Sequence, residues 1–356
     1  MSELNQHLLA IIQDGFPLVE RPYLHLAEML NVSEQEAFDA VEMLRASGVI
    51  RRIGGVYDSR KLGFISRLCA GKMMTSSQDF SAESHEATAM EKFAVAVNEE
   101  PAITHNYIRS HEYNVWFTVI AENEAAIETI VERICAKTEL HDVHVLSATK
   151  KYKINTVMGG ADAPVVSRLW LVNRIGGESL EARQSLAGAL TESDRTRIRT
   201  ACDDIPHSLT PFKDWGISCD ELREDLASKR MRRFGAILRH QNAGFAFNAM
   251  VCFDLDERGG YQKPAESRHS DPGVLCTKGE ESSKVLLLAK KHYVSHCYER
   301  PSFEGFPYNL YAMMHAQTSA ELDDYIKDAA TLLGNPEYVV LHSVRELKKT
   351  SFKFFV

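Results

Sequence analysis

Two segments of the sequence carry histidine, tyrosine and arginine at matching positions, one in each half of the chain. The first reads His-Asn-Tyr-Ile-Arg from residue 105, and the second reads His-Cys-Tyr-Glu-Arg from residue 296. A histidine of near-neutral pKa can transfer a proton, and an arginine can bind a carboxylate through two parallel hydrogen bonds. We call these residues the first triad and the second triad: His105, Tyr107 and Arg109, and His296, Tyr298 and Arg300.

Further motifs flank each triad in the same order. An Arg-Arg-hydrophobic-Gly motif stands upstream at 51–54 and 232–235, and a Tyr-Asn-hydrophobic-aromatic motif stands downstream at 113–116 and 308–311. Such repetition indicates a tandem duplication. Side chains two residues apart share one face of a β-strand, so each triad is expected to project together toward a pocket.

The first half predicts a helical domain followed by a mixed α+β domain. Apolar residues recur at helical spacing in 4–13 and 22–30, and Ser33 with Glu36 forms a capping box for a third helix. A glycine-containing strand at 49–57 would complete a winged helix-turn-helix over residues 1–60. The order of elements in 61–157 is that of a ferredoxin-like βαββαβ domain, with strands at 64–74, 103–108, 113–121 and 143–154 and helices at 80–98 and 123–138.

The second half repeats this plan. A linker at 158–188 leads to a second helix-turn-helix-like domain at 189–243, with helical segments near 189–203 and 218–230. A second ferredoxin-like βαββαβ domain follows at 244–356, with a polar loop near 254–281. Its elements are strands at 245–253, 292–298, 307–315 and 338–344 and helices near 281–290 and 318–333. The fold class is therefore α+β, a tandem duplication in which the two halves form an internal pseudo-dimer.

The composition is that of a soluble protein with more than one domain. The chain has 356 residues, of which 44% are hydrophobic, and a formal net charge of -8, which argues against general attraction to nucleic acid or an anionic membrane. Its seven cysteines include no Cys-x-x-Cys pair, as expected for reduced thiols. With no apolar stretch near the length of a membrane span and no signal-peptide pattern, we expect a cytoplasmic protein without a membrane partner.

The first helix-turn-helix is poorly suited to DNA. Residues 1–50 hold eight acidic residues against Arg21 and Arg45, and four of the acids stand on the would-be recognition helix. Because DNA affinity comes largely from Lys and Arg on phosphates, we expect this domain to be a scaffold. The second such domain carries more arginines, but two of them, Arg232 and Arg233, belong to the duplicated motif, which favours a small-ligand role.

The order of winged helix and βαββαβ domain resembles the Lrp/AsnC-type regulators. The triads, with the flanking Arg-Arg-hydrophobic-Gly and Tyr-Asn-hydrophobic-aromatic motifs, resemble more closely the siroheme decarboxylases that share this fold, in their fused two-half form. The resemblance implies a carboxy-lyase that removes the carboxyl groups of two acetate side chains of siroheme, giving didecarboxysiroheme, in haem or haem d1 biosynthesis. It implies siroheme as the partner and no added cofactor, because the substrate carries its own iron.

Siroheme is a flat macrocycle edged with carboxylates, so its site needs cations, aromatic plates and a proton donor. We expect catalytic roles for His105, His296, Tyr107 and Tyr298. The expected substrate-binding residues are Arg51, Arg52, Arg109, Arg232, Arg233, Arg300, His240, Tyr113, Asn114, Trp116, Tyr308, Asn309 and Tyr311. His296 and His240 are the candidates for an axial ligand of the substrate iron; His240 has Ser59 at the matching place in the first half.

The sequence is compatible with several alternatives. The triads could share one large pocket between the halves, or form one strong and one degenerate site. The residues of the Tyr-Asn-hydrophobic-aromatic motif could be ordinary core and turn residues. As functions, a ligand-responsive Lrp/AsnC-type transcription regulator and a non-catalytic haem-binding carrier compete with the lyase. Pairing of whole chains into a homo-oligomer is left open.

Overall fold

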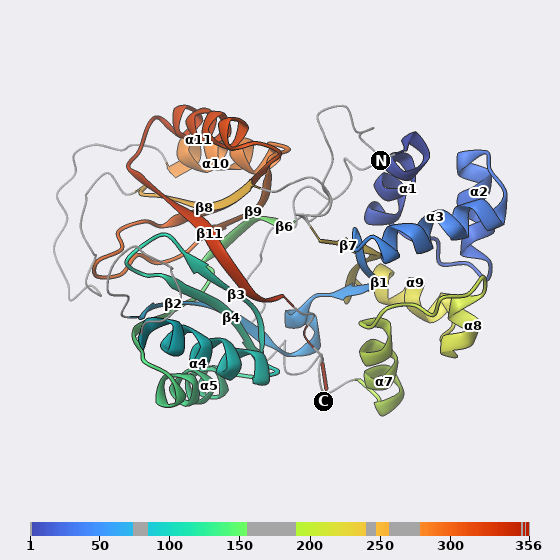
Figure 1. Cartoon of the computed structure of the whole chain (residues 1–356), viewed down its shortest axis with the longest axis horizontal. Coiled ribbons are helices and arrows are strands. Elements are labelled where there is room, and N and C mark those ends of the chain that lie inside the picture. Colours follow the sequence, from blue (N-terminus) through green and yellow to red (C-terminus); the bar gives the residue numbers. More distant parts are fainter. Residues whose placement is uncertain are drawn as a thin grey trace.

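The computed structural model describes residues 2–73, 85–154, 190–239, 247–255 and 278–349, together with Phe352, Phe354 and Phe355. The predicted linker, nearly all of the predicted polar loop, and His240 lie outside the described residues. In the described part of the chain, every helix is too short or too polar to span a bilayer. Figure 1 shows a helical part on one side of the molecule and a sheet-containing part on the other.

The helical part consists of two heads, one from each half. The first head contains α1 (Glu3–Asp14), α2 (Pro22–Leu30), α3 (Glu34–Ala46) and β1 (Ile50–Tyr57). The predicted capping box at the start of α3 is confirmed, because Ser33 and Glu36 each bond the other's backbone N–H. The second head contains α7 (Glu192–Ala201), α8 (Pro211–Trp215), α9 (Cys219–Ala227) and β7 (Met231–Leu238).

The predicted wing of the first head is not a hairpin of its own. Strand β1 pairs antiparallel with β7 of the other half, and Gly54 stands opposite Gly235. A Cβ atom on Gly54 would overlap the carbonyl oxygen of Asp203, and one on Gly235 would overlap that of Ile12. Each glycine of the duplicated motif therefore lets the other half's head approach its strand closely. The two heads share one apolar core.

Each half also supplies a four-stranded sheet covered by two helices. The first has β2 (Ile65–Met73), β3 (Ile103–Arg109), β4 (Val115–Ala121) and β5 (Leu140–Leu146), with α4 (His85–Glu99) and α5 (Glu124–Lys137). A short 3-10 helix, η1 (Ser59–Leu62), precedes β2. The second has β8 (Phe247–Phe253), β9 (Val294–Glu299), β10 (Leu310–Ala316) and β11 (Tyr338–Lys349), with α10 (Lys278–Lys290) and α11 (Ser319–Leu333).

The closing strand of each half extends into the other half's sheet. The strand predicted at 143–154 is in fact two, β5 and then β6 (Lys150–Ile154), and β6 pairs with β9. Likewise β11 continues past the predicted end at 344 and pairs with β3. Among the described residues, nine strands form one sheet in the order β5-β2-β4-β3-β11-β8-β10-β9-β6. The internal pseudo-dimer thus rests on exchanged strands.

The two parts of this sheet pack against each other through a buried apolar cluster. Trp116 and Leu146 from the first half meet Tyr311 and Leu341 from the second. The opposite face of each part packs on its own helices. Figure 1 accordingly shows α4 and α5 on one outer side and α10 and α11 on the other, with the strands between them.

Candidate functional site

The triads lie on the strands β3 and β9. In β3, His105 is level with Thr118 and Tyr107 with Trp116 of β4, so both point to the side of the sheet that faces the other half. In β9, His296 is level with Met313 and Tyr298 with Tyr311 of β10. The even spacing therefore places histidine and tyrosine on one face, as the sequence predicts.

The triad arginines connect the two halves. Nη1 of Arg109 donates to the carbonyl oxygen of Leu341 at 2.9 Å, and Nη1 of Arg300 donates to that of Leu146 at 2.7 Å. Burial lowers the pKa of Arg109 to about 10 and also lowers the pKa of Arg300. In the described part of the chain, the buried Nε of each arginine has no hydrogen-bond partner. Each guanidinium is thus bound to the backbone of the other half.

The two triads form two separate groups. Strands β11, β8 and β10 stand between β3 and β9 in the sheet order. The charged side chains that act on Tyr107 are Arg109, Arg51 and Glu346, whereas those that act on Tyr298 are Arg300, Arg232 and Arg60. The two triads thus have different charged neighbours, which favours the alternative of one strong and one degenerate site, while the alternative of one shared pocket stays a prediction.

The first site group contains the first triad with Arg51 and Glu346. Glu346 of β11 is the register partner of Tyr107, and burial together with this carboxylate raises the pKa of Tyr107. Burial lowers the pKa of Arg51, and the negative charge of Glu346 opposes that shift. A fixed carboxylate therefore stands among the cations of this group.

The second site group contains the second triad with Asp58, Arg60, Lys151 and Arg232. Lys151 of β6 is the register partner of Tyr298, and its ammonium lies 5.8 Å from the centre of that ring. Burial and the charges of Arg60 and Arg232 lower the pKa of Lys151 to about 7. The carboxylate of Asp58 is bound by Arg60 at 2.9 Å and lies 3.7 Å from Arg232. In this group the side chains of Arg60, Lys151, Arg232 and Arg300 thus outnumber the carboxylate of Asp58.

The Arg-Arg pairs divide between the sites and the heads. The first residue of each pair, Arg51 or Arg232, belongs to a site group. The second points the other way, as alternation along a strand requires. Arg52 donates to the carbonyl oxygen of Gly55 at 3.3 Å, and Arg233 donates to that of Gln13 in α1. Arg52 and Arg233 are thus bonded to backbone carbonyl oxygens of the helical part, and their expected substrate-binding role stays a prediction.

The Tyr-Asn-hydrophobic-aromatic motif of the first half serves the fold. The Tyr113 hydroxyl donates to Asp142 at 2.9 Å, and the Asn114 side chain bonds both backbone polar groups of Met73. Trp116 is 1% exposed and donates from Nε1 to the carbonyl oxygen of Tyr113. Because these side chains are buried and their polar atoms are bonded internally, the structure favours the alternative that they are core and turn residues.

The equivalent motif of the second half is mixed in its roles. The Asn309 side chain accepts from the backbone N–H of Leu255 at 3.0 Å, and Tyr308 packs edge-on against Phe306, so both stabilise the hairpin. Both are only partly buried, and the substrate-binding role expected for them stays a prediction. Tyr311 is buried, and its ring centre lies 5.9 Å from the guanidinium carbon of Arg300. Tyr311 therefore adjoins the guanidinium of a triad arginine.

The two triad histidines have different polar neighbours. Nδ1 of His105 lies 2.9 Å from Oγ1 of Thr104. Nδ1 of His296 lies 2.9 Å from Oγ of Ser295, and that hydroxyl also lies 2.8 Å from Nε2 of His315. The motif alignment places Ile120 at the position of His315 in the first half. The histidine–serine–histidine chain therefore belongs to the second half.

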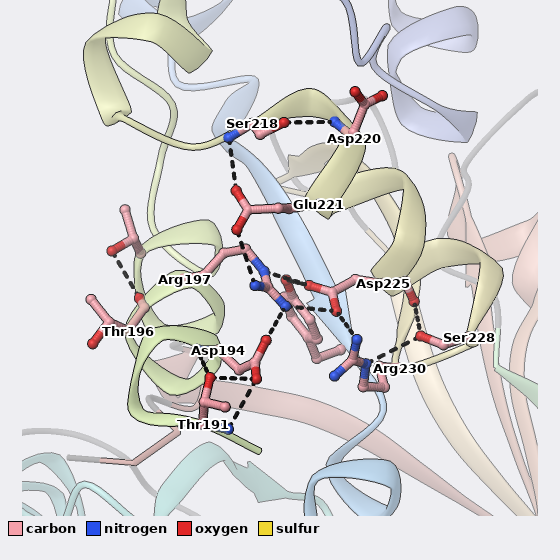
Figure 2. Close-up of polar contacts among 12 residues, drawn as sticks. Thr191, Asp194, Thr196, Arg197, Ser218, Asp220, Glu221, Asp225, Ser228 and Arg230 are labelled. Atoms are coloured by element: carbon pink, nitrogen blue, oxygen red, sulfur yellow. Dashed lines mark hydrogen bonds and ion pairs between the residues drawn. The ribbon is translucent and has the colours of Figure 1, made fainter. Parts of the chain in front are cut away.

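Arginines of the second head are also bound internally. Figure 2 shows Arg197 and Arg230 converging on Asp225, whose side chain is 0% exposed. The Tyr57 hydroxyl from the first half donates to the same carboxylate at 2.9 Å. These groups stabilise the contact between the heads, and the expectation that the heads do not bind DNA stays a prediction.

Four members of the site groups escaped the sequence analysis: Asp58, Arg60, Lys151 and Glu346. The run Lys-Lys-Tyr-Lys from residue 150 was a usable signal, because such a basic strand is unusual in an acidic chain. The partner of that strand lies in the other half, however, and only the fold reveals it.

Comparisons with known proteins agree with this arrangement. A model of the siroheme decarboxylase NirDL-like helix-turn-helix domain matches residues 5–51, and a model of the AsnC-like ligand binding domain matches 81–153 and 276–348. The siroheme decarboxylase alpha subunit of Desulfovibrio desulfuricans is 42% identical over 43% of this chain and 82% of that subunit. The chain belongs to the siroheme decarboxylase family.

Other members of the siroheme decarboxylase family match nearly the whole chain. The siroheme decarboxylase of Hydrogenobacter thermophilus is 28% identical over 98% of this chain and 94% of its own length. A crystal structure of the siroheme decarboxylase NirDL in co-complex with an iron-uroporphyrin III analogue superposes with a TM-score of 0.61 at 25% identity, covering 99% of this chain and 95% of that one. The fused two-half plan is thus found within the family.

Proposed function

We propose that this chain is a siroheme decarboxylase, a carboxy-lyase that converts two acetate side chains of siroheme to methyl groups in haem or haem d1 biosynthesis. The observation that carries the proposal is the pair of His–Tyr–Arg triads, each set beside further cations, in a member of this family. The acidic α3 and the internally bound arginines of the second head count against the alternative of an Lrp/AsnC-type regulator.

The residues of the site groups suit the chemistry of decarboxylation. When the bond between the methylene carbon and the carboxyl carbon breaks, carbon dioxide leaves and the electron pair stays on the methylene carbon, where the ring can delocalise it. A triad histidine then supplies the proton that completes the methyl group. Arginines bind the carboxylates that remain, and fixed cations in a partly buried site act more strongly than in water.

This reaction balances without an oxidant or a reductant, so the expectation that no added cofactor is required stands as part of the proposal. The iron belongs to the substrate, and His296 or His240 remains the candidate axial ligand. Ser295 fixes the orientation of the His296 ring through its hydrogen bond to Nδ1. The reduced, cytoplasmic setting and the possibility of further chain pairing also stay predictions.

Mass spectrometry of the product tests the proposal. The anaerobically purified chain is incubated with siroheme, and the tetrapyrrole is extracted and weighed. Loss of two carbon dioxide units per macrocycle is the expected result. Siroheme that is bound tightly but recovered unchanged would make the chain a carrier, and specific DNA binding with a steep salt dependence would make it a regulator.

A further inference from the structure

The exchanged strands place a residue of opposite charge at the same position of each site group. Glu346 on β11 is the register partner of Tyr107, and Lys151 on β6 is the register partner of Tyr298. Each residue comes from the half that does not supply the triad. The two halves therefore have the same backbone pairing beside the triad tyrosine, but the residue at that position is acidic in one site group and basic in the other.

A second pair of equivalent positions with opposite charge lies at the ends of the strands β1 and β7. Asp58 follows β1, and Arg239 follows β7 at the equivalent position of the repeat. Asp58 acts on Lys151 and Arg232, whereas Arg239 acts on Arg51. The carboxylate of the first site group, Glu346, thus lies on the sheet. The carboxylate of the second, Asp58, follows a strand of the head and is already bound by Arg60.

The two groups consequently differ in what they attract. In the first, Glu346 is the register partner of Tyr107, and its carboxylate acts on both Arg51 and Tyr107, so it offsets positive charge that would attract an anionic ligand. In the second, no carboxylate of the described residues forms an ion pair with Lys151, and the charges of Arg60, Arg232 and Arg300 all act on it. A carboxylate-bearing ligand would relieve that repulsion.

We infer that Lys151 binds a carboxylate of the iron tetrapyrrole and that the second site group receives this substrate, whereas Glu346 keeps the first site group closed to it. The inference rests on the proposed function for the class of ligand. The chain from His296 through Ser295 to His315 supports the same assignment independently, because the first half has Ile120 in place of His315. The active half is thus completed by a strand of the other half.

Titration of the full chain with iron uroporphyrin, followed by absorbance, tests the inference. The unaltered chain is expected to bind one macrocycle. Lys151→Met and Lys151→Glu are expected to weaken binding by about 10- to 100-fold, the range that loss of a hydrogen bond to a charged group produces. The matched control is Lys150→Glu on the same strand, because Lys150 is exposed and lies over Tyr152, away from the triad.

Equal affinities in the Lys151 and Lys150 variants, or two equivalent macrocycles in the unaltered chain, would overturn the inference. Glu346→Lys is expected to add a second, weaker binding event, and an unchanged stoichiometry would refute the role given to Glu346. Binding that depends on Lys151 without release of carbon dioxide from siroheme would refute the proposed function alone. Decarboxylation with normal binding by Lys151→Glu would refute this inference alone.

Discussion

The guanidinium of Arg300 donates a hydrogen bond of 2.7 Å to the backbone carbonyl oxygen of Leu146, at the end of the other half's strand β5. The same guanidinium lies 5.1 Å from the ring centre of Tyr298. One side chain therefore joins the second triad to the first half. Since Lys151 stands on the strand that follows Leu146, this contact also fixes the position of the inferred carboxylate-binding lysine relative to the triad.

The triad histidines are expected to differ in importance. His296→Ala should lower turnover by about 10²- to 10⁴-fold, the usual contribution of a positioned proton donor. His105→Ala should cost far less, because its site group is held closed by Glu346. Single-turnover rates with siroheme, together with thermal unfolding of both variants, check this. Equal losses of rate in the two variants would contradict the unequal roles.

The pKa of Lys151 predicts a pH dependence of both stability and binding. The folded-state pKa of about 7 lies below the ordinary 10.5, so between these values the unfolded chain binds a proton that the folded chain does not. Lys151 therefore makes the free energy of unfolding rise with pH across this window. A bound carboxylate should raise the pKa again, so ligand binding near pH 8 should take up a proton.

Calorimetric titration with iron uroporphyrin in two buffers of different ionisation enthalpy measures that proton uptake. The uptake should be smaller in Lys151→Met than in the unaltered chain. The same uptake in both proteins would show that another group titrates.

Much of the fold could be predicted from the sequence. The predictions that failed share a physical cause, which is that they depend on contacts between distant parts of the chain. Capping at Ser33 and the even spacing of the triads are local properties, so periodicity and residue type revealed them. The pairing of β6 with β9 is a choice between two possible partner strands, which local pattern does not encode. Residue type also cannot separate Trp116, a core residue, from an aromatic side chain that faces a ligand.

The buried carboxylate of Asp225 is expected to be essential for stability. Asp225→Ala would leave Arg197 and Arg230 without their shared partner and should cost about 3–5 kcal/mol in the free energy of unfolding. Urea denaturation measures the loss. Asp220→Ala on the same helix is the control, because its side chain is 82% exposed, and that variant should unfold like the unaltered chain. If Asp225→Ala unfolded at the same urea concentration as the unaltered chain, the stabilising role of this network (Figure 2) would be refuted.

The close approach of the heads predicts a sharp difference between two glycines. A Cβ on Gly235 would lie 2.6 Å from the carbonyl oxygen of Ile12, whereas one on Gly15 would meet nothing within 4 Å. Gly235→Ala should therefore destabilise the chain by about 1–3 kcal/mol through backbone displacement, and Gly15→Ala should not. Thermal unfolding of the pair checks the prediction, and identical midpoints would show that the heads have room to separate.

The location of the substrate iron distinguishes the two site groups. Crystals of the chain grown with iron uroporphyrin would give an anomalous difference map measured at the iron absorption edge. One iron peak per chain is expected, beside Tyr298, Lys151 and Arg232. A peak beside Tyr107 and Glu346, or equal peaks in both site groups, would contradict it.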